Sequence, residues 1–409
     1  MGRRDGEHEG RPMRPEPMSA TLRRKKLLLL MPLPPPLHGS NLMNQYVADS
    51  PELREVFDVQ LLSIRYVSSI ADIGRISGKK ALIFLSLVSR LAVTLVWFRP
   101  DFVYFVPAVT GLSFYRDYLL SLVIKSSGCR VIYHIHGKGI GERAINPIVG
   151  YLYRSFFNNG FVILLSRLLF DEFRRFVRED SVRYLANGIE MIQKARMPDA
   201  CGYDEATRIL FLSNLMLSKG PIVLLDAAVI LRDMGLPFML DIVGNPSIEM
   251  SLGEFQGLIE AKGLESCVFL LGPKYGQEKL DVLARSDMLV FPTSNDCFPL
   301  VILEAMSQGL PVISTFQGAI SEIVEDGVTG LLIKAADPVM LAEKMAYLIG
   351  NPKVRLDMGA MGRKKFEEMY DLRVFNRNLV DVLAQITGAS WMSGGAPIEL
   401  RERVNRFGR

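Results

Sequence analysis

Short, continuous apolar runs alternate with helical patterns along most of this 409-residue chain. In the first half the predicted strands are residues 26–31, 59–64, 102–106, 130–136, 161–165 and 182–185. In the second half they are residues 208–213, 238–243, 268–271, 288–291, 312–314 and 330–333. Strands of this kind, separated by helices that cover both of their faces, indicate doubly wound parallel sheets. The pattern therefore predicts two α/β halves.

Length and local composition divide the chain further. A chain of 409 residues is too long for one ordinary core, so we expect two domains. The predicted segments are a disordered basic tail at 1–22, an N-terminal Rossmann-like domain at 23–192, a linker at 193–207, a C-terminal Rossmann-like domain at 208–372, a C-terminal helix at 373–387 that packs back across, and a loose tail at 388–409.

Two carboxylates flank the joint between a predicted strand and the helix after it. Asp296 lies on the loop 292–298, at the carboxyl end of a strand, where open parallel sheets bind ligands. A helix from Pro299 would be apolar nearly all round, with one narrow polar strip. That strip consists of Glu304, Ser307 and Gln308. Glu304 is either part of a solvent-facing strip or a cleft carboxylate that accepts hydrogen bonds from ligand hydroxyls, and the pattern favours neither.

Two turns have features of an anion site. Gly39 opens a helix after the first strand, where free amides and close backbone approach suit a phosphate. The alternative is an ordinary turn capped by Ser40 or Asn41. Lys219 follows Ser218, a predicted N-cap, at the positive end of a helix dipole. An anion would compensate that charge, although an exposed lysine loses only ~0.5 kcal/mol there.

Two histidines end the strand at 130–136. His134 and His136 share one face by the period of two, but no obvious third ligand for a metal follows. His136 precedes Gly137 and Gly139 at the carboxyl end of the strand. It is either a hydrogen-bonding or acid-base group that faces the cleft, or a satisfied structural histidine.

Composition excludes several classes of protein. The net charge of +4 is small and the basic residues are dispersed, so nucleic acid is not an expected partner. The four cysteines form no Cys-x-x-Cys pair, which indicates reduced thiols in a cytosolic setting and neither a disulfide framework nor a zinc site. They are Cys129, Cys201, Cys267 and Cys297.

One apolar segment raises the question of a membrane. Residues 81–98 form an apolar run nearly as long as the ~20 residues that span a bilayer. Arg90 in the middle of this run would be costly at the centre of a bilayer. We expect a buried helix here, with a membrane-surface helix as the alternative. The basic tail at 1–22 lacks the apolar core of a signal peptide, and it is either idle or a contact for anionic lipid.

The segment from Asp296 to Glu304 and its continuation Gly309-Leu-Pro-Val312 resemble glycosyltransferase family 4, a retaining group with the two-domain GT-B fold. The nine residues are similar to the family's E-x7-E segment. Further matches are Ser218-Lys-Gly220, Asn187-Gly188, Gly318-Ala-Ile-Ser-Glu322 and Gly327-Val-Thr-Gly-Leu-Leu332. The resemblance is strong over 209–370 and fainter over 26–190, where it rests on His38-Gly39 and His136-Gly137.

The resemblance implies an α/β GT-B fold whose two domains face an interdomain cleft. Glu304 would hold the ribose of a nucleotide-sugar donor, and Asp296 with the amides after Cys297 would hold the sugar. Lys219 would neutralise the diphosphate, Gly39 would let backbone amides approach it, and His136 would lie near the sugar. The implied catalytic residues are His136, Asp296 and Lys219. The implied donor-binding residues are Gly39, Asn214, Lys219, Asp296, Phe298, Pro299, Leu300, Val301 and Glu304.

Two residues depart from the family pattern. Asp296 is one methylene shorter than the usual glutamate, and Asn214 stands where an arginine often pairs with the diphosphate. No Asp-x-Asp pair for a metal occurs in the sequence, so the expected chemistry needs neither a metal nor a cofactor.

The predicted function is retaining, metal-independent transfer of a sugar from a UDP- or GDP-linked donor to a glycan or lipid-linked acceptor, with the N-terminal domain on the acceptor side. The predicted location is the cytoplasm, with peripheral contact at the inner face of the membrane as an option. The alternatives are a non-catalytic glycan- or partner-binding protein of the same fold and an epimerase or phosphorylase on the same scaffold.

Overall fold

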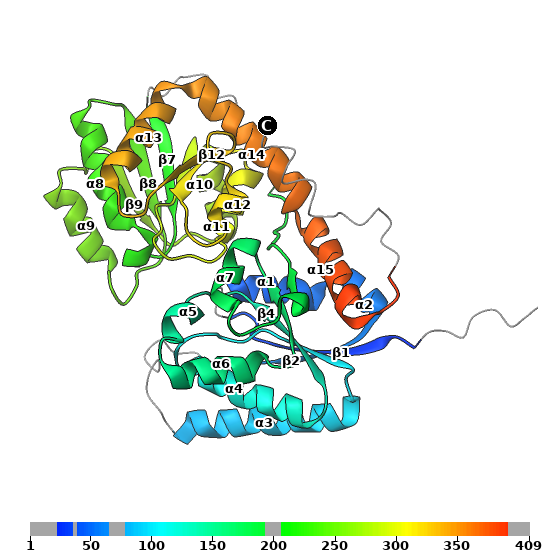
Figure 1. Ribbon diagram of the computed structural model, residues 1–409. Helices are drawn as coiled ribbons and strands as arrows, with labels where there is room; N and C mark the ends of the chain where they lie inside the picture. The colour runs from blue at the N-terminus through cyan, green and yellow to red at the C-terminus, as the bar shows by residue number, and fades with distance from the viewer. Residues whose placement is uncertain (1–22, 36–38, 65–77, 193–205, 392–409) are drawn as a thin grey trace, which may run out of the picture.

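The computed structural model describes residues 23–35, 39–64, 78–192 and 206–391. They form two α/β domains, one around each of two parallel sheets, with a long C-terminal helix that returns from the second domain to the first (Figure 1). The predicted tail at 1–22 lies outside the described residues, as do most of the predicted linker and residues 392–409.

The N-terminal domain contains a six-stranded parallel sheet with the order β2-β1-β3-β4-β5-β6. Its strands are β1 (Lys25–Met31), β2 (Phe57–Ser63), β3 (Phe102–Phe105), β4 (Arg130–Ile135), β5 (Phe161–Leu164) and β6 (Val182–Tyr184). β1 is an interior strand: Leu27 to Leu30 are fully buried and pair with β2 on one side and β3 on the other. Each predicted strand of this half is present.

Helices cover both faces of this sheet. The helices are α1 (Gly39–Asp49), α2 (Pro51–Val56), α3 (Gly78–Phe98), α4 (Gly111–Ser126), α5 (Ile140–Arg143), α6 (Pro147–Phe157) and α7 (Phe170–Phe173). Alternate residues of β1 enter two different cores, since Leu27 and Leu29 pack with α1 and α2, whereas Leu28 and Leu30 pack with α3, α4 and α6.

The C-terminal domain repeats the design with the strand order β12-β11-β10-β7-β8-β9. Its strands are β7 (Thr207–Leu212), β8 (Phe238–Val243), β9 (Val268–Gly272), β10 (Met288–Val290), β11 (Val312–Thr315) and β12 (Gly330–Ile333). Its helices are α8 (Pro221–Asp233), α9 (Leu252–Ala261), α10 (Gly276–Arg285), α11 (Leu300–Ser307), α12 (Ile320–Ile323), α13 (Pro338–Gly350) and α14 (Pro352–Met369). The predicted second sheet is confirmed.

The strand orders place the predicted loops at the topological switch point of each sheet, where successive strands begin to add on the opposite side of the first strand. In the second sheet that point lies between β7 and β10, which pair through Met288 and Ile209. In the first sheet it lies between β1 and β3. Crevices outside the carboxyl ends of strands at such switch points are where open α/β sheets bind ligands. Lys219 follows β7, Asp296 follows β10 and Gly39 follows β1.

A short crossing connects the two domains. The backbone of Ile189 bonds with Tyr370 and Leu372, at the junction of α14 and helix α15 (Leu372–Thr387). α15 then packs against α2 of the N-terminal domain, and one buried core contains residues of both domains. Gly188 is required in this crossing because a Cβ there would lie 2.6 Å from Phe375 Cβ.

Three local predictions are wrong. The segment 81–98 forms a helix, but only 17% of it is buried, because α3 covers the outer side of its domain. Ser218 is not the N-cap of α8: it lies in a 3-10 turn, and the cap is Gly220 at φ +80°. Pro299 caps α11 from outside, because its ψ of 118° is extended and the helix begins at Leu300.

Candidate functional site

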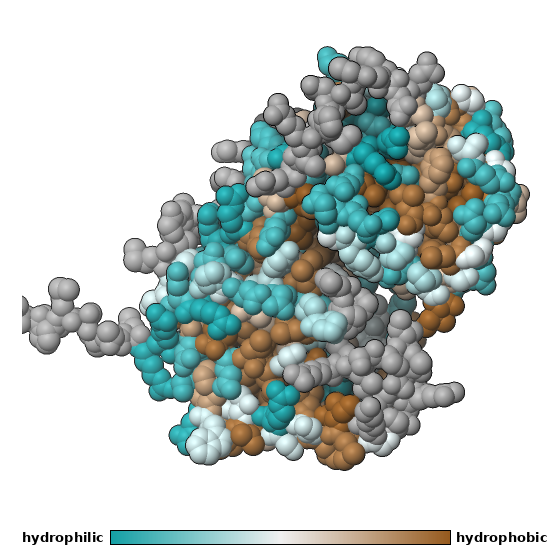
Figure 2. Space-filling model, turned by 180° about the vertical axis from the view of Figure 1, so that it is seen from behind, coloured by the Kyte–Doolittle hydropathy of each residue, from teal (hydrophilic) through white to brown (hydrophobic). Residues whose placement is uncertain are grey.

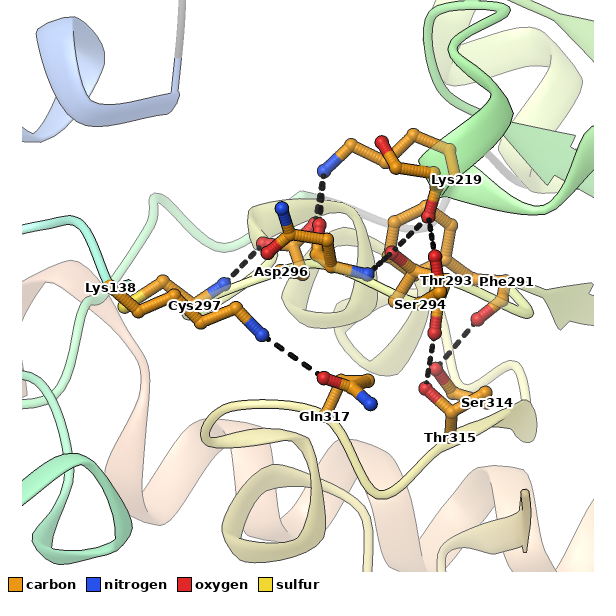
Figure 3. A network of polar contacts seen from close by, with 12 residues as sticks. Lys138, Lys219, Phe291, Thr293, Ser294, Asp296, Cys297, Ser314, Thr315 and Gln317 are labelled. Carbon is orange, nitrogen blue, oxygen red and sulfur yellow. Dashed lines mark hydrogen bonds and ion pairs between the residues drawn. The ribbon is translucent and has the colours of Figure 1, made fainter. Parts of the chain in front are cut away.

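Lys219 and Asp296 meet between the loops that follow β7 and β10 (Figure 3). The Lys219 ammonium lies 2.6 Å from Asp296 Oδ2 and also donates to the carbonyl of Asn295 at 3.3 Å. The second carboxylate oxygen, Asp296 Oδ1, accepts the amide of Cys297 at 2.9 Å. Both oxygens of Asp296 are therefore engaged, and its short side chain is directed toward Lys219.

A polar network fixes the two loops relative to each other. The carbonyl of Ser218 accepts the amide of Ser294 at 2.8 Å and the hydroxyl of Thr293 at 3.1 Å. The hydroxyl of Thr315, at the end of β11, donates to the carbonyl of Thr293 at 2.6 Å (Figure 3). The loop after β10 is thus bonded to the turn that contains Lys219 and to the end of β11, so the positions of Lys219 and Asp296 are set by backbone as well as side-chain contacts.

Two glycines allow the loops to approach closely. A Cβ on Gly220 would lie 2.2 Å from the carbonyl oxygen of Pro292, and one on Gly318 would lie 2.4 Å from that of Asp296. Both have positive φ, 80° and 56°, which side chains rarely adopt. The sequence matches at Ser218-Lys-Gly220 and at Gly318 therefore correspond to steric requirements of this loop pair.

Glu304 lies on the inner side of α11, not on a solvent-facing strip. Its residue is 8% exposed, and the rest of the predicted strip, Ser307 and Gln308, is also buried. Lys279 of α10 donates to Glu304 Oε1 at 2.7 Å. The other oxygen, Oε2, is buried and has no hydrogen-bond partner among the described residues. One half of this carboxylate therefore remains able to accept a hydrogen bond.

Asn214 follows β7 but lies apart from the Lys219–Asp296 pair. Its amide oxygen accepts Asn245 Nδ2 at 3.2 Å, and the hydroxyl of Tyr275 donates to Asn245 Oδ1 at 2.9 Å. Asn214 therefore belongs to a chain of neutral polar side chains, Asn214, Asn245 and Tyr275, that follows the ends of β7, β8 and β9.

The N-terminal domain faces these residues. α1 begins at Gly39, and a Cβ on Gly39 would lie 3.4 Å from Leu300 Cδ1, the first residue of α11. The ammonium of Lys138 donates to Gln317 Oε1 at 3.0 Å across the two domains (Figure 3). The pKa of Tyr46, on α1, is raised by burial first and then by the charges of neighbouring carboxylates that include Glu304. The ends of β1 and β4 therefore oppose the loop of Asp296.

His136 follows β4 with its Nε2 buried and without a partner among the described residues. Its ring lies 4.3 Å from that of His134, centroid to centroid, which confirms that the two share a face. His134 in turn bonds through Nδ1 to the hydroxyl of Tyr104. Burial lowers the pKa of His136 to about 4, so this imidazole is neutral at pH 7 and could take part in a hydrogen bond but not carry a positive charge.

The remaining predicted residues line the turn into α11. Phe298 is buried, and its ring meets Tyr370 edge-on at 6.1 Å, so its side chain belongs to the core. Leu300 is buried at the start of α11 and Val301 is half-buried beside it. Pro299 has no amide hydrogen, so the donors available in this turn are the amides of the other three residues.

Sequence reasoning missed three polar residues of the site. Lys138 lies within the Gly137–Gly139 turn and Gln317 precedes Gly318, so both were adjacent to recognised motifs. Lys279 had no signal, because its partner Glu304 is 25 positions away on another helix. Within the described part of the chain, no three His, Cys, Asp or Glu side chains are grouped as metal ligands.

Comparison with known sequences supports a relationship in the C-terminal domain. Residues 201–365 match the family described as Glycosyl transferases group 1. The D-inositol 3-phosphate glycosyltransferase of Corynebacterium efficiens is 31% identical over 154 residues, which are 37% of this chain and 36% of that protein. An uncharacterized glycosyltransferase of Methanocaldococcus jannaschii is 32% identical over 160 residues, or 38% of this chain and 43% of that protein. The match thus spans about a third of the length of the first of these relatives and less than half of the second.

Comparison with solved structures extends over both domains. Anabaena HepE in complex with UDP and glucose has a TM-score of 0.68 at 17% identity, covering 87% of this chain and 99% of that one. Sucrose-phosphate synthase from Thermosynechococcus elongatus has a TM-score of 0.68 at 16% identity, covering 89% and 100%. These likenesses show the fold: the chain has the two-domain α/β architecture called GT-B.

Proposed function

We propose that this protein is a glycosyltransferase that moves a sugar from a UDP- or GDP-linked donor to a glycan or lipid-linked acceptor. The observation that carries the proposal is Glu304: its carboxylate is buried, Lys279 donates to Oε1, and Oε2 has no hydrogen-bond partner in the part of the chain that the structure describes. A buried acceptor without a partner costs about 1–3 kcal/mol. A ribose hydroxyl that donates to Oε2 would recover this free energy. The group 1 match over residues 201–365 and the complex of HepE with UDP and glucose support the same assignment.

The donor diphosphate would bind at the ends of β7 and β1. Lys219 would exchange part of its contact with Asp296 for a phosphate oxygen, and the first amides of α1 would contribute from the other domain. Amides at a helix N-terminus carry partial positive charge and bind phosphate well. With Asn214 in place of an arginine, Lys219 supplies the main positive charge for the leaving group.

The sugar would lie between Asp296 and His136. Asp296, with the amides that follow Cys297, would accept and donate hydrogen bonds to its hydroxyls. Neutral His136 would present its Nε2 to the sugar or to the acceptor. These groups come from two domains, so a productive site needs both of them.

The proposed reaction proceeds on one face of the sugar with retention. The bond between the anomeric carbon and the phosphate oxygen breaks while the acceptor oxygen bonds to the same carbon. The acceptor's proton moves to the departing phosphate oxygen. Lys219 and backbone amides stabilise the charge that develops on the diphosphate, an electrostatic contribution that often dominates catalysis. The proposal includes no protein nucleophile, no metal and no cofactor.

Turnover assays test this proposal. A panel of UDP- and GDP-sugars is first screened by thermal shift, and the stabilising donors are then assayed for release of nucleoside diphosphate with glycan and lipid-linked acceptors. We expect acceptor-dependent release that chelators leave unchanged, with an α-linked product from an α-linked donor by NMR. Loss of activity in EDTA, or inversion at the anomeric carbon, would contradict the corresponding part of the proposal.

A second candidate is a non-catalytic binding protein of the same fold. The observation that favours it is that Asp296 has both oxygens engaged and Asn214 bonds away from Lys219. Calorimetry with UDP and GDP separates the two, because the transferase must bind one of them. If folded protein shows no heat of binding with millimolar UDP or GDP, the result supports the non-catalytic binding function.

A further inference from the structure

Helix α3 carries an apolar face that points away from its own domain. Its residues Ala81–Phe98 have a mean hydropathy of 2.1, yet only 17% of this segment is buried. Leu82, Val93 and Trp97 are 69%, 57% and 83% exposed. Apolar side chains exposed side by side on this scale mark a surface for another molecule.

The opposite side of α3 is bound to the domain core. Leu87, Leu91 and Leu95 recur every four residues and are buried against the sheet and α4. A helix held along its length by such a stripe lies flat on its domain. To cross a bilayer it would have to remove these leucines from the core, so the segment suits the plane of a surface better than a span.

The apolar surface extends over the two neighbouring helices. α3 packs beside α4, and α4 beside α6, so the three form one layer on the sheet. We call their outward side the basal face. Its exposed apolar residues are Leu82, Ile83, Leu85, Val93, Val96 and Trp97 on α3, Leu112, Tyr115, Leu119 and Leu122 on α4, and Ile148 and Tyr151 on α6. Figure 2 shows hydrophobic side chains along this lower edge of the N-terminal domain.

The basal face carries positive charge and no free carboxylate. On α3, α4 and α6 the only acidic residue is Asp117, which is fully buried and paired with Arg116 at 2.7 Å. Exposed cations are present on two of these helices, Arg90 on α3 and Arg154 on α6. An apolar surface with cations and no anions is complementary to the surface of an anionic membrane.

We propose that the basal face docks the protein on an anionic lipid bilayer, with α3 in the plane of the interface and Trp97 at the level of the headgroups. A second copy of the chain fits less well. A two-fold symmetric contact would bring the cations of two basal faces together with no exposed carboxylate of these helices to pair them. The docking does not depend on the proposed donor site, although it would bring a lipid-linked acceptor to the N-terminal domain.

Vesicle flotation and tryptophan fluorescence test the docking. The sequence has two tryptophans, so Trp391→Phe leaves Trp97 as the only tryptophan, which is excited selectively over tyrosine. The full chain is mixed with vesicles of phosphatidylcholine alone or with added phosphatidylglycerol. We expect flotation with the anionic vesicles and a blue shift of Trp97 emission. Flotation without any shift would place the contact elsewhere, for example on the basic tail, and overturn the proposal.

Matched variants locate the contact. The double variant Leu82→Glu/Val93→Glu, and separately Arg90→Glu, should weaken binding to anionic vesicles roughly tenfold or more. The control Leu356→Glu changes a residue of α14 that is 70% exposed, and it should bind as the wild type does. Nucleotide binding, measured in parallel, should be unchanged in all of them, which separates this test from that of the donor site.

Two outcomes would overturn the proposal. One is equal binding of the double variant and the control to anionic vesicles. The other is a concentration-dependent dimer, seen by sedimentation without lipid, that the double variant abolishes while vesicles bind neither protein. That second result would assign the basal face to a second copy of this chain.

Discussion

The ammonium of Lys219 contacts Asp296 and would also face an anion bound beyond the ends of β7 and β10. Its ammonium lies 2.6 Å from Asp296 Oδ2, and both side chains are only partly exposed, 21% and 16%. Partial desolvation strengthens such contacts, and Asp296 keeps the ammonium at the strand end, where a diphosphate would arrive. The pair thus positions a cation that would otherwise be a mobile side chain.

Lys219→Ala should reduce kcat/KM for the donor by roughly 10²-fold, because the developing charge of the leaving diphosphate loses its main cation. Release of nucleoside diphosphate measures the effect. The matched control is Lys262→Ala, which breaks a similar 2.6 Å pair with Asp226 between α8 and the end of α9. The control should stay within about twofold of wild type, since surface pairs contribute little. Equal losses in both variants would mean that Lys219 acts only on stability.

Burial of His136 makes a prediction about pH. Its pKa falls from an ordinary value of 6.5 to about 4 in the folded protein, so the unfolded chain binds a proton between these values while the folded one does not. Stability from this group is therefore present above pH 6.5 and is lost as the pH falls toward 4. The imidazole resonance should titrate in NMR with a midpoint near 4. A midpoint near 6.5 would refute the buried neutral imidazole.

At the level of elements, the loops depend on glycines. Gly318 and Gly327 both have positive φ, 56° and 77°, but only Gly318 lies against another backbone, 2.4 Å from Asp296 O if it had a Cβ. Gly327→Ala should cost about 1–2 kcal/mol of stability, the cost of the left-handed conformation alone. Gly318→Ala should cost more and should also reduce turnover, because the loop of Asp296 must move. Urea unfolding and kcat/KM measure the two effects, and equal behaviour of the two variants would contradict this account.

The strands of both domains could be predicted from sequence because parallel strands that are buried on both faces consist of continuous runs of apolar residues. The exposure of α3 could not be predicted in that way. Leu87 and Leu82 are the same residue type, yet one is 7% and the other 69% exposed. Hydropathy depends only on the residue type, whereas the burial of a side chain depends on which neighbours the fold places beside it.

At the level of the whole molecule, α15 joins the domains. Phe375 is 1% exposed, and it packs on the crossing at Gly188 in a core that both domains share. Phe375→Ala should lower the free energy of unfolding by about 3–5 kcal/mol. Leu356→Ala, at a residue 70% exposed on α14, should change it by less than about 1 kcal/mol. Urea unfolding compares them, and similar values would show that α15 is a loosely attached appendage.

The candidate site was partly predictable because the buried parallel strands were. Gly39, Lys219, Asp296 and His136 follow strands, and strand ends gather on one edge of each sheet, so their approach follows from topology. The Glu304–Lys279 pair joins two helices, and the Lys138–Gln317 bond joins two domains. No local pattern encodes contacts of that kind, because they depend on the final packing of distant elements.

Calorimetry with nucleotides is the direct test of whether Glu304 binds the nucleotide of a sugar donor. UDP and GDP are titrated into the wild type and the variants Glu304→Ala and Asp226→Ala. Asp226 is the control because it also pairs with a lysine, Lys262, at 2.6 Å, but lies on α8 outside the proposed donor site. We predict that the better nucleotide binds the wild type and the Asp226 variant alike. Glu304→Ala should bind it roughly tenfold or more weakly, since a charged hydrogen bond contributes about 1.5–3 kcal/mol. Equal affinity in all three folded proteins would show that Glu304 does not bind the nucleotide.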